Sequence, residues 1–328
     1  MHLEYFLAFL VFLLAVSGSV AFAEDGGGGF LFITFKGEET PMTEQVYFVL
    51  SKDGRTWHAL NDAKPVLVSQ LGEKGVRDPF LLRSHDGRKF FLIATDLSIH
   101  LNHDWGRSVR AGSKSILVWE SEDLVKWSEP RLIPVAPDDA GCTWAPEAVY
   151  DKDAGDYLVF WASTTKADNF GKHRIWAART KDFKTFGKPF VYIERDQAVI
   201  DTDIVQAGDK YYRFNKDETV KAVTMEAADK LDGPWKPVDT FSLKSLHGYE
   251  GPQCYVLEPA NGDKPATWCL LLDYYSRGRG YQPYLTTDLA SGDFKPAQGF
   301  KFPFRTRHGS VLPVTAEEYE RLVKAYGR

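Results

Sequence analysis

Five short polar motifs recur along the chain, each directly before a run of hydrophobic residues. In chain order they are Arg77-Asp78-Pro79, Trp144-Ala145-Pro146-Glu147, Ile200-Asp201-Thr202-Asp203, Glu250-Gly251-Pro252 and Arg307-His308-Gly309. One ionisable residue stands out in each, at spacings of 49 to 69 residues: Asp78, Glu147, Asp201, Glu250 and His308. An ionisable group that returns once per repeat predicts radial symmetry, in which every unit directs one side chain at a common centre. Carboxylates that lie close together repel one another and shift their pKa values. This lowers the stability of the fold and is typical of catalytic sites.

A second repeat supports the first. A Ser/Thr-x-Asp turn followed by an aromatic residue occupies residues 51–57, 121–127 and 180–186, with weaker echoes at 231–235 and 287–294. Between the polar motifs lie paired strand-like runs separated by Gly- and Asp-rich tips, which is hairpin chemistry. Each unit therefore has about four strands, and five such units predict an all-β fold, a five-bladed β-propeller. A sandwich or a two-domain β protein is the competing architecture, but it does not explain the recurring ionisable residues.

The ends of the chain predict how the ring closes. The fifth motif begins near His308, so residues 311–314 supply only the first strand of the last blade. Residues 30–35 and 46–50 at the other end are good strands and would complete it, which protects the sheet edges. Only residues 315–328 have a helical pattern.

The N-terminus predicts export. An apolar run over residues 6–16 is followed by Ala21-Phe22-Ala23, the pattern of a signal peptide cleaved after residue 23. The n-region has Glu4 and no Lys or Arg, so an uncleaved membrane anchor is the alternative, although the run is near the minimum length that can span. We expect a signal peptide at 1–23, a Gly-rich lead-in at 24–29 and a single catalytic domain at 30–328. The protein would be secreted, extracellular or periplasmic, and would meet a membrane only during export.

The composition limits the classes of molecule that the protein is expected to bind. The net charge is −5 with no long basic run, so nucleic acid is not an expected partner. Aromatic residues make up 14% of the chain, which fits β packing or a carbohydrate-stacking surface. In an exported protein Cys254 and Cys269 could form a disulfide that leaves Cys142 over, or all three could be buried thiols. No zinc motif is present.

The first strands of propeller blades converge at one end of the axis, so the five ionisable residues would line one cavity. Several carboxylates without metal-ligand spacing predict general acid–base catalysis. Glycoside hydrolysis needs such a set: one protonated acid for the leaving oxygen, and one ionised base or nucleophile.

The ordered set of motifs resembles the five-bladed propeller glycoside hydrolases of family 43, which are mostly α-L-arabinofuranosidases, β-xylosidases and arabinanases. The resemblance covers nearly the whole mature chain. It implies that Asp78 is the general base, Glu250 the general acid and Asp201 the residue that tunes the pKa of the acid. It also implies inversion at the anomeric carbon, for which base and acid stand roughly 6.5–9.5 Å apart.

Other positions have open roles. Relatives carry Asp-Pro at the third motif where this chain has Asp201-Thr202-Asp203, and because residues two apart share a strand face, Asp203 could take the role of Asp201. Glu147 and Arg307 are candidates for substrate contact. His308 resembles a central histidine that in some relatives helps to hold a calcium ion or water, and a structural histidine is the alternative. No cofactor is required, and a structural calcium ion is the one metal the resemblance suggests. Trp105, Trp144 and Trp161 could form a sugar platform or pack in the core.

We therefore expect a monomeric hydrolase that removes terminal arabinofuranosyl or xylosyl groups from oligosaccharide or polysaccharide. A retaining fructan hydrolase of the propeller type is the second interpretation, but its Asn-Asp-Pro motif is absent, since Ala63 follows Asn61-Asp62. A non-catalytic sugar-binding propeller is the third, and it would be favoured if the carboxylates did not converge.

Overall fold

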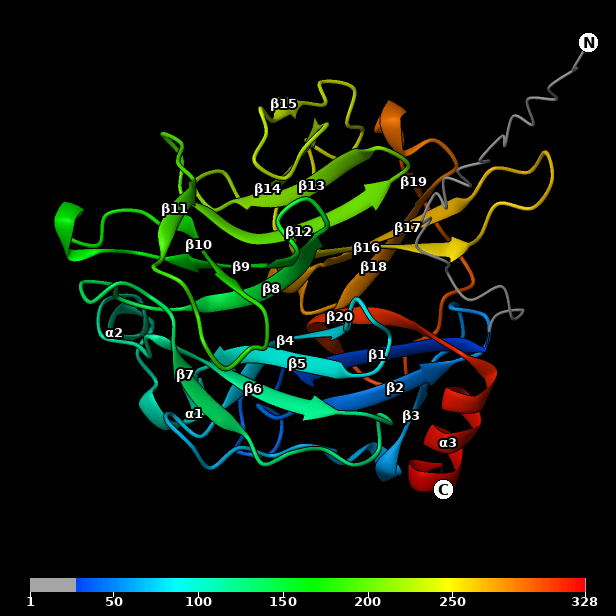
Figure 1. Cartoon of the computed structure of the whole chain (residues 1–328), viewed down its shortest axis with the longest axis horizontal. Helices are drawn as coiled ribbons and strands as arrows, with labels where there is room; N and C mark the ends of the chain where they lie inside the picture. Colours follow the sequence, from blue (N-terminus) through cyan, green and yellow to red (C-terminus); the bar gives the residue numbers. More distant parts are fainter. Residues whose placement is uncertain (1–27, 328) are drawn as a thin grey trace, which may run out of the picture.

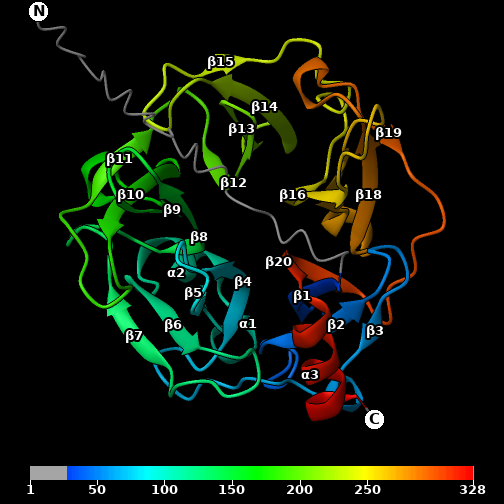
Figure 2. The same cartoon turned by 45° about the vertical axis from the view of Figure 1, so that its right-hand side comes forward.

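The computed structural model of the chain describes residues 28–327. Five four-stranded antiparallel sheets stand around a common axis, as the blades of a propeller (Figures 1 and 2). The predicted five-bladed β-propeller is therefore confirmed. The predicted signal peptide at 1–23 and most of the Gly-rich lead-in lie outside the described residues. None of the helices within residues 28–327 is both long and apolar enough to cross a membrane.

Four of the blades are continuous in sequence, and in each of them the chain runs from the innermost strand outwards. Their strands are β4 (Val76–Arg83), β5 (Phe90–Asp96), β6 (Ser115–Ser121) and β7 (Arg131–Pro134); β8 (Trp144–Asp151), β9 (Asp156–Ser163), β10 (Arg174–Thr180) and β11 (Phe190–Ile193); β12 (Val199–Ala207), β13 (Lys210–Asp217), β14 (Ala222–Ala228) and β15 (Lys236–Pro237); and β16 (Glu250–Glu258), β17 (Thr267–Asp273), β18 (Tyr281–Thr286) and β19 (Lys295–Pro296).

The fifth blade joins the two ends of the chain. Its order is β20 (Thr306–Val314), β1 (Gly29–Lys36), β2 (Tyr47–Ser51) and β3 (His58–Ala59), so β20 lies at the axis and pairs with β1. This is the predicted closure, with β20 beginning five residues earlier than the predicted strand and β1 beginning inside the predicted lead-in. The helix α3 (Ala316–Tyr326) follows β20, as predicted, and buries Leu322 against this blade.

Short helices between strands were not predicted. The β5–β6 connection contains α1 (Ile99–Asn102) and α2 (Trp105–Arg110). Each is started by an N-cap, since Ser98 accepts a hydrogen bond from the Leu101 amide and Asp104 accepts one from the Arg107 amide. A helix of four to six residues is too short to have a hydrophobic period, so the sequence does not reveal it. Four 3-10 turns complete the structure: η1 (Asn61–Ala63), η2 (Lys166–Asp168), η3 (Tyr275–Arg277) and η4 (Leu289–Ser291).

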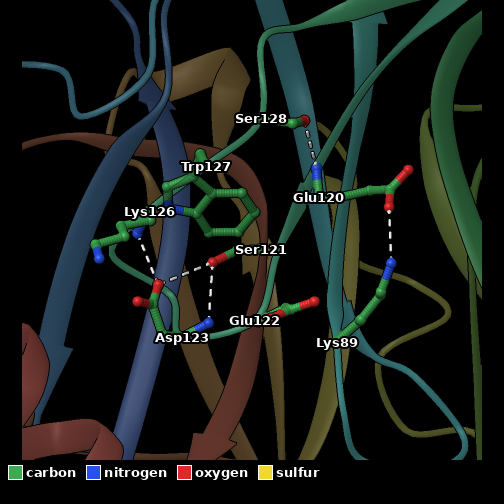
Figure 3. Close-up of a pocket in the computed structure, with 8 residues that line it drawn as sticks. All are labelled: Lys89, Glu120, Ser121, Glu122, Asp123, Lys126, Trp127 and Ser128. Atoms are coloured by element: carbon green, nitrogen blue, oxygen red, sulfur yellow. Dashed lines mark hydrogen bonds and ion pairs between the residues drawn. The ribbon is translucent and has the colours of Figure 1, made fainter.

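The repeated Ser/Thr-x-Asp motif forms the same turn at the outer edge of successive blades. Figure 3 shows one copy, in which the Asp123 carboxylate accepts hydrogen bonds from the Lys126 amide at 2.7 Å and from the Ser121 hydroxyl. Asp53 and Asp182 make the corresponding bonds in their own turns. The pocket drawn in Figure 3 is formed by this turn and its neighbours, so it lies at a blade edge.

The core consists of five hydrophobic clusters, and each lies between two adjacent blades. This packing uses much of the aromatic content, including Trp161, which is fully buried and therefore packs in the core and is not a sugar platform. Cys142, Cys254 and Cys269 are free and buried, so the disulfide alternative is wrong. Cys254 faces Leu270, and Cys269 faces Tyr255 in the β16–β17 pairing.

Candidate active site

All five inner strands carry a β-bulge at the polar motif, including β20, whose pairing with β1 shifts between Thr306 and Gly309. The pairing with the second strand shifts within β4, β8, β12 and β16, and one residue in each of these four bulges has a positive φ: Asp78 (48°), Ala145 (46°), Asp201 (50°) and Gly251 (55°). Positive φ is uncommon outside glycine and is found mostly in Asn and Asp among other residues. The bulge adds one residue and turns the side chains of the motif towards the axis.

The bulges also show which residues of the motifs are structurally equivalent. Asp78, Ala145, Asp201 and Gly251 occupy equivalent positions, whereas Glu147 lies two residues after its bulge residue and Glu250 one residue before it. The prediction that the ionisable residues recur in phase is therefore wrong in detail. They still converge, because the bulge region of every blade lies at the same end of the axis and the five inner strands contact one another around it.

His308, on β20, lies among three of the carboxylates. Its Nδ1 is 3.5 Å from Asp78 Oδ1 and 3.8 Å from Asp201 Oδ1, and its Nε2 is 3.8 Å from Glu147 Oε1. Burial alone would lower the pKa of His308, but these three carboxylates outweigh burial and raise it to about 10. His308 is therefore a buried cation that offsets the charge of the carboxylates around it.

Exposure separates the five residues into two groups. The side chains of Asp78 and Glu250 are 17% and 18% exposed, whereas those of Glu147, Asp201 and His308 are 5%, 8% and 6% exposed. Only Asp78 and Glu250 among these five can be reached readily by a molecule from solvent. The other three are buried among them.

Asp78 is held by the neighbouring strand of its own blade. Its Oδ2 accepts a hydrogen bond from the Thr95 hydroxyl at 2.9 Å, and Thr95 Oγ1 accepts one from the Ala145 amide at 2.8 Å. Thr95 thus connects Asp78 to the bulge of the next blade. This contact leaves Oδ1 of Asp78 directed towards His308.

Asp201 and Asp203 both bind the inner strand of the following blade. Asp201 Oδ2 accepts from the Gly251 amide at 3.0 Å, and Asp203 Oδ2 accepts from the Cys254 amide at 2.7 Å. Burial raises the pKa of Asp201 to about 6, with a further contribution from the charge of Glu250. Burial and the charge of Glu147 raise the pKa of Asp203 well above its usual range. Asp201 therefore interacts with Glu250, whereas Asp203 interacts with Glu147, and this favours Asp201 as the residue that tunes Glu250.

Glu250 is bound by two cations. Its Oε2 accepts a hydrogen bond from Lys216 Nζ and its Oε1 from Arg307 Nη2, both at 2.8 Å. Burial opposes ionisation of Glu250, but the charges of Lys216 and Arg307 outweigh it and lower the pKa to about 2. Arg307 also donates from Nε to Asp273 Oδ2 at 2.6 Å, so its guanidinium is already occupied by two carboxylates. The predicted proton donor is thus an anion in this state of the site.

Glu147 and Trp144 differ in how a substrate could reach them. Glu147 is buried, and burial raises its pKa to about 7, which makes it a poor candidate for direct substrate contact. Trp144 is partly exposed, stacks on His173 with ring centres 5.0 Å apart, and meets Trp105 edge-on at 6.0 Å. Trp105, on α2, is 48% exposed. Trp105 and Trp144 therefore form an aromatic surface that a sugar ring could stack on.

The calcium ion that the resemblance suggests stays a prediction. Within residues 28–327, no three His, Cys, Asp or Glu side chains are arranged to hold a metal. His308 itself lies among the carboxylates that could bind such an ion.

Sequence reasoning missed Lys216, Asp273 and Glu44. Lys216 and Asp273 lie near the ends of the second strands of their blades, where no repeated motif marks them. The one signal for Asp273 is that it directly follows an apolar run. Glu44 is buried and accepts from Arg77 Nη1 at 2.8 Å, from the Ser98 hydroxyl and from the Ile99 amide. Arg77 is therefore a structural partner of Glu44, and together they anchor α1 beside the axis.

Comparison with known proteins identifies relatives. Residues 25–320 match the family model described as a "probable glycosyl hydrolase domain", which is related to glycoside hydrolase family 43. An α-L-arabinofuranosidase from Bifidobacterium longum subsp. longum is 30% identical over 272 residues, which cover 71% of this chain. The match spans only 25% of that larger protein.

Solved structures show the same fold at low identity. The family 43 protein BlXynB from Bacillus licheniformis superposes with a TM-score of 0.51 at 15% identity, covering 89% of this chain and 60% of that one. An exo-β-1,3-galactanase from Phanerochaete chrysosporium gives a TM-score of 0.49 at 16% identity, covering 67% of this chain and 49% of that one. At this level of identity the likeness concerns the fold alone.

Proposed function

The chain belongs to the family 43-related glycosyl hydrolases, and on that premise we propose that it hydrolyses terminal arabinofuranosyl or xylosyl bonds with inversion. The observation that carries the proposal is the pair of accessible carboxylates, Asp78 and Glu250, beside three buried ionisable groups. An inverting glycosidase needs two such groups in contact with the substrate. The α-L-arabinofuranosidase relative supports the arabinofuranosyl choice.

In this reaction Asp78 takes a proton from water as the water oxygen attacks the anomeric carbon. The glycosidic C–O bond breaks, and the leaving oxygen receives the proton of Glu250. The products are the free sugar with inverted configuration and the shortened chain, with Asp78 protonated and Glu250 ionised. Exchange of both protons with solvent restores the enzyme.

The charges at the axis support a neutral sugar. Six carboxyl groups lie there with three cations: Asp78, Glu147, Asp201, Asp203, Glu250 and Asp273 with Lys216, Arg307 and His308. Burial raises the pKa of four of these carboxyl groups, so part of the set is protonated and the excess of negative charge is smaller than the count. A uronic acid or a phosphorylated sugar would add another negative charge to this excess. Such a substrate would therefore be disfavoured.

The test compares substrates that differ in their leaving group. The parent should cleave 4-nitrophenyl α-L-arabinofuranoside or β-D-xyloside and the matching oligosaccharide, with the β-D-galactoside and the β-fructofuranoside as comparisons. Asp78→Asn should lower kcat by about 10²- to 10⁴-fold on all of them. Glu250→Gln should be as harmful on the oligosaccharide but much less so on the nitrophenyl glycoside, because 4-nitrophenolate leaves without a proton.

Asp86→Asn is the matched control for these variants, because Asp86 is an exposed carboxylate on the tip that joins β4 to β5. It should leave every rate unchanged. Proton NMR of the first-formed sugar should give the inverted anomer. Retention would favour the fructan-type alternative, and activity that survives both Asp78→Asn and Glu250→Gln would overturn the assignment.

We also propose that residues 1–23 are removed on export, as the apolar run and the Ala-x-Ala pattern suggest. Expression of the full chain in a secreting host, followed by N-terminal sequencing, tests this. A mature protein that begins at Glu24 is the expected result, whereas membrane-bound protein with an intact N-terminus would support the anchor alternative.

A further inference from the structure

Two buried cations hold Glu250, and each has a second carboxylate of its own. Lys216 Nζ is 2.8 Å from Glu250 Oε2 and 2.8 Å from Glu218 Oε2. Arg307 likewise joins Glu250 to Asp273. Glu250 is therefore one of three carboxylates that share two cations, and it is the one of the three that belongs to the cluster around the axis.

The two contacts of Lys216 are not equivalent. Lys216 donates a hydrogen bond to Glu250, whereas its contact with Glu218 Oε2 is an ion pair without hydrogen-bond geometry. The Lys216 side chain is only 3% exposed, and its ammonium group lies 4.4 Å from the ring centre of Tyr275. A buried ammonium left without a carboxylate is strongly unfavourable. Protonation of Glu250 would leave Lys216 in that position if Glu218 were not there.

We propose that Lys216 and Glu218 are a pair of positioning residues for Glu250: Lys216 holds it as a carboxylate in the empty site, and Glu218 keeps Lys216 paired when Glu250 carries the proton for the leaving group. This inference rests on the proposed function, because it assigns the proton of Glu250 to the leaving oxygen. Neither residue acts on the substrate directly.

A bound sugar would raise the pKa of Glu250. The glycosidic oxygen of a bound sugar can only accept a hydrogen bond, so it favours the protonated form of Glu250, and the sugar also removes water from the site. Both effects raise the pKa of a carboxylate. Lys216 can then keep its contact with Glu218, so Glu250 takes up a proton only when a substrate is present.

The charged and titratable groups around Glu250 come from five elements. They are Lys216 on β13, Asp201 on β12, Asp273 on β17, Tyr275 on η3, and Arg307 and His308 on β20. Arg307, Asp201 and Asp273 stay in place in variants of Lys216 and Glu218. Lys221 Nζ also donates a hydrogen bond to Glu218 Oε1, so a shift in Glu218→Gln is assigned to Glu218 together with its two lysines.

The test uses two variants with opposite expected signs. Lys216→Met removes the cation, so the pKa of Glu250 should rise by about 1 to 3 units. Glu218→Gln removes the second carboxylate, so the whole charge of Lys216 acts on Glu250 and its pKa should fall. The pKa is read from the carboxyl carbon of Glu250 by ¹³C NMR titration, assigned with Glu250→Gln, and needs no substrate.

Kinetics give a second readout on the oligosaccharide substrate. The basic limb of the pH profile of kcat should move to higher pH in Lys216→Met and to lower pH in Glu218→Gln, and Lys216→Arg should restore most of the parent profile. Lys210→Met is the matched control, because Lys210 lies on the same strand, is exposed and removes the same charge. It should shift neither the pKa nor the profile.

The outcomes separate the two proposals. An active parent in which neither variant moves the pKa of Glu250 overturns the positioning role and leaves the hydrolase function standing. A parent that cleaves none of the sugars overturns the proposed function, and with it the proton-donor role, even if both variants shift the pKa as expected. If Lys216→Met fails to fold, Glu218→Gln, which conserves the side-chain volume, still decides the question by its downward shift.

Discussion

Gly251→Ala places a single methyl group against the histidine at the centre of the site. Gly251 has a φ of 55°, and a Cβ at this position would lie 2.7 Å from His308 Cγ, 2.9 Å from Cδ2 and 3.0 Å from His308 Cβ. Ordinary contact begins near 3.4 Å, so the imidazole would have to move by about 0.7 Å. The imidazole is the cation that Asp78, Asp201 and Glu147 share.

The cost has two parts that separate experimentally. An alanine in the left-handed region costs about 1–2 kcal/mol of unfolding free energy, which lowers Tm by roughly 2–3 °C in a domain of this size. Displacement of His308 changes the position of Asp78, and a misplacement of this order lowers kcat/KM by about 10- to 100-fold. Thermal unfolding measures the first part, and initial rates on the best nitrophenyl glycoside measure the second.

Ala145→Gly is the matched control, because Ala145 occupies the same bulge position with a φ of 46°. The chain tolerates a Cβ there, so its removal should change Tm by a few degrees at most and leave kcat/KM within about twofold. If Gly251→Ala lowers Tm but leaves kcat/KM unchanged, His308 is not held in place by Gly251 and the reasoning is refuted. A loss of activity in Ala145→Gly as large as in Gly251→Ala would assign the effect to the bulge itself.

Three further predictions follow from the contacts described. Asp201→Asn removes a like charge beside Glu250, so the pKa of Glu250 should fall further and the basic limb of the pH profile of kcat should move to lower pH. Asp203→Asn should leave that limb in place, and pH–rate profiles of both variants test this. Thr315→Ala removes the N-cap and capping box of α3 and should lower the unfolding free energy by about 1 kcal/mol without changing kcat, as measured by denaturant unfolding beside rate assays. Trp105→Ala should raise KM for oligosaccharides several-fold and leave Tm unchanged, because half of its side chain is exposed beside Trp144; equal KM values would remove it from the sugar surface.

The fold could be predicted because its signals are local and repeated. The Asp123 turn needs only residues within five positions of it, and the same is true of the turns at Asp53 and Asp182. Hairpin tips are likewise fixed by their own Gly and Asp residues. Five copies of one local pattern reinforce one another, so errors in single elements, such as the missed α1 and α2, do not change the architecture.

The site could be predicted only in part, because its geometry depends on bulges. A bulge inserts one residue and moves the following side chain to the other face, so spacing along the chain cannot tell whether Glu147 or Ala145 is equivalent to Asp78. Both Asp201 and Asp203 point at β16, and only their partners distinguish them. Those partners are backbone amides about 50 residues away, which carry no side-chain signal in the sequence.

Lys216 and Asp273 explain why the acid–base assignment cannot be completed from motifs. The sequence suggested that Asp201 would raise the pKa of Glu250, since like charges repel. That repulsion raises the pKa of both carboxyl groups, and the neighbouring cations decide whether Asp201 or Glu250 keeps the proton. Lys216 and Arg307 both bind Glu250, so in the empty site the pKa of Glu250 is lowered and that of Asp201 is raised. With Glu250 as the proton donor that we propose, sugar binding has to reverse that order. The second carboxylates of Lys216 and Arg307 then keep both buried cations paired.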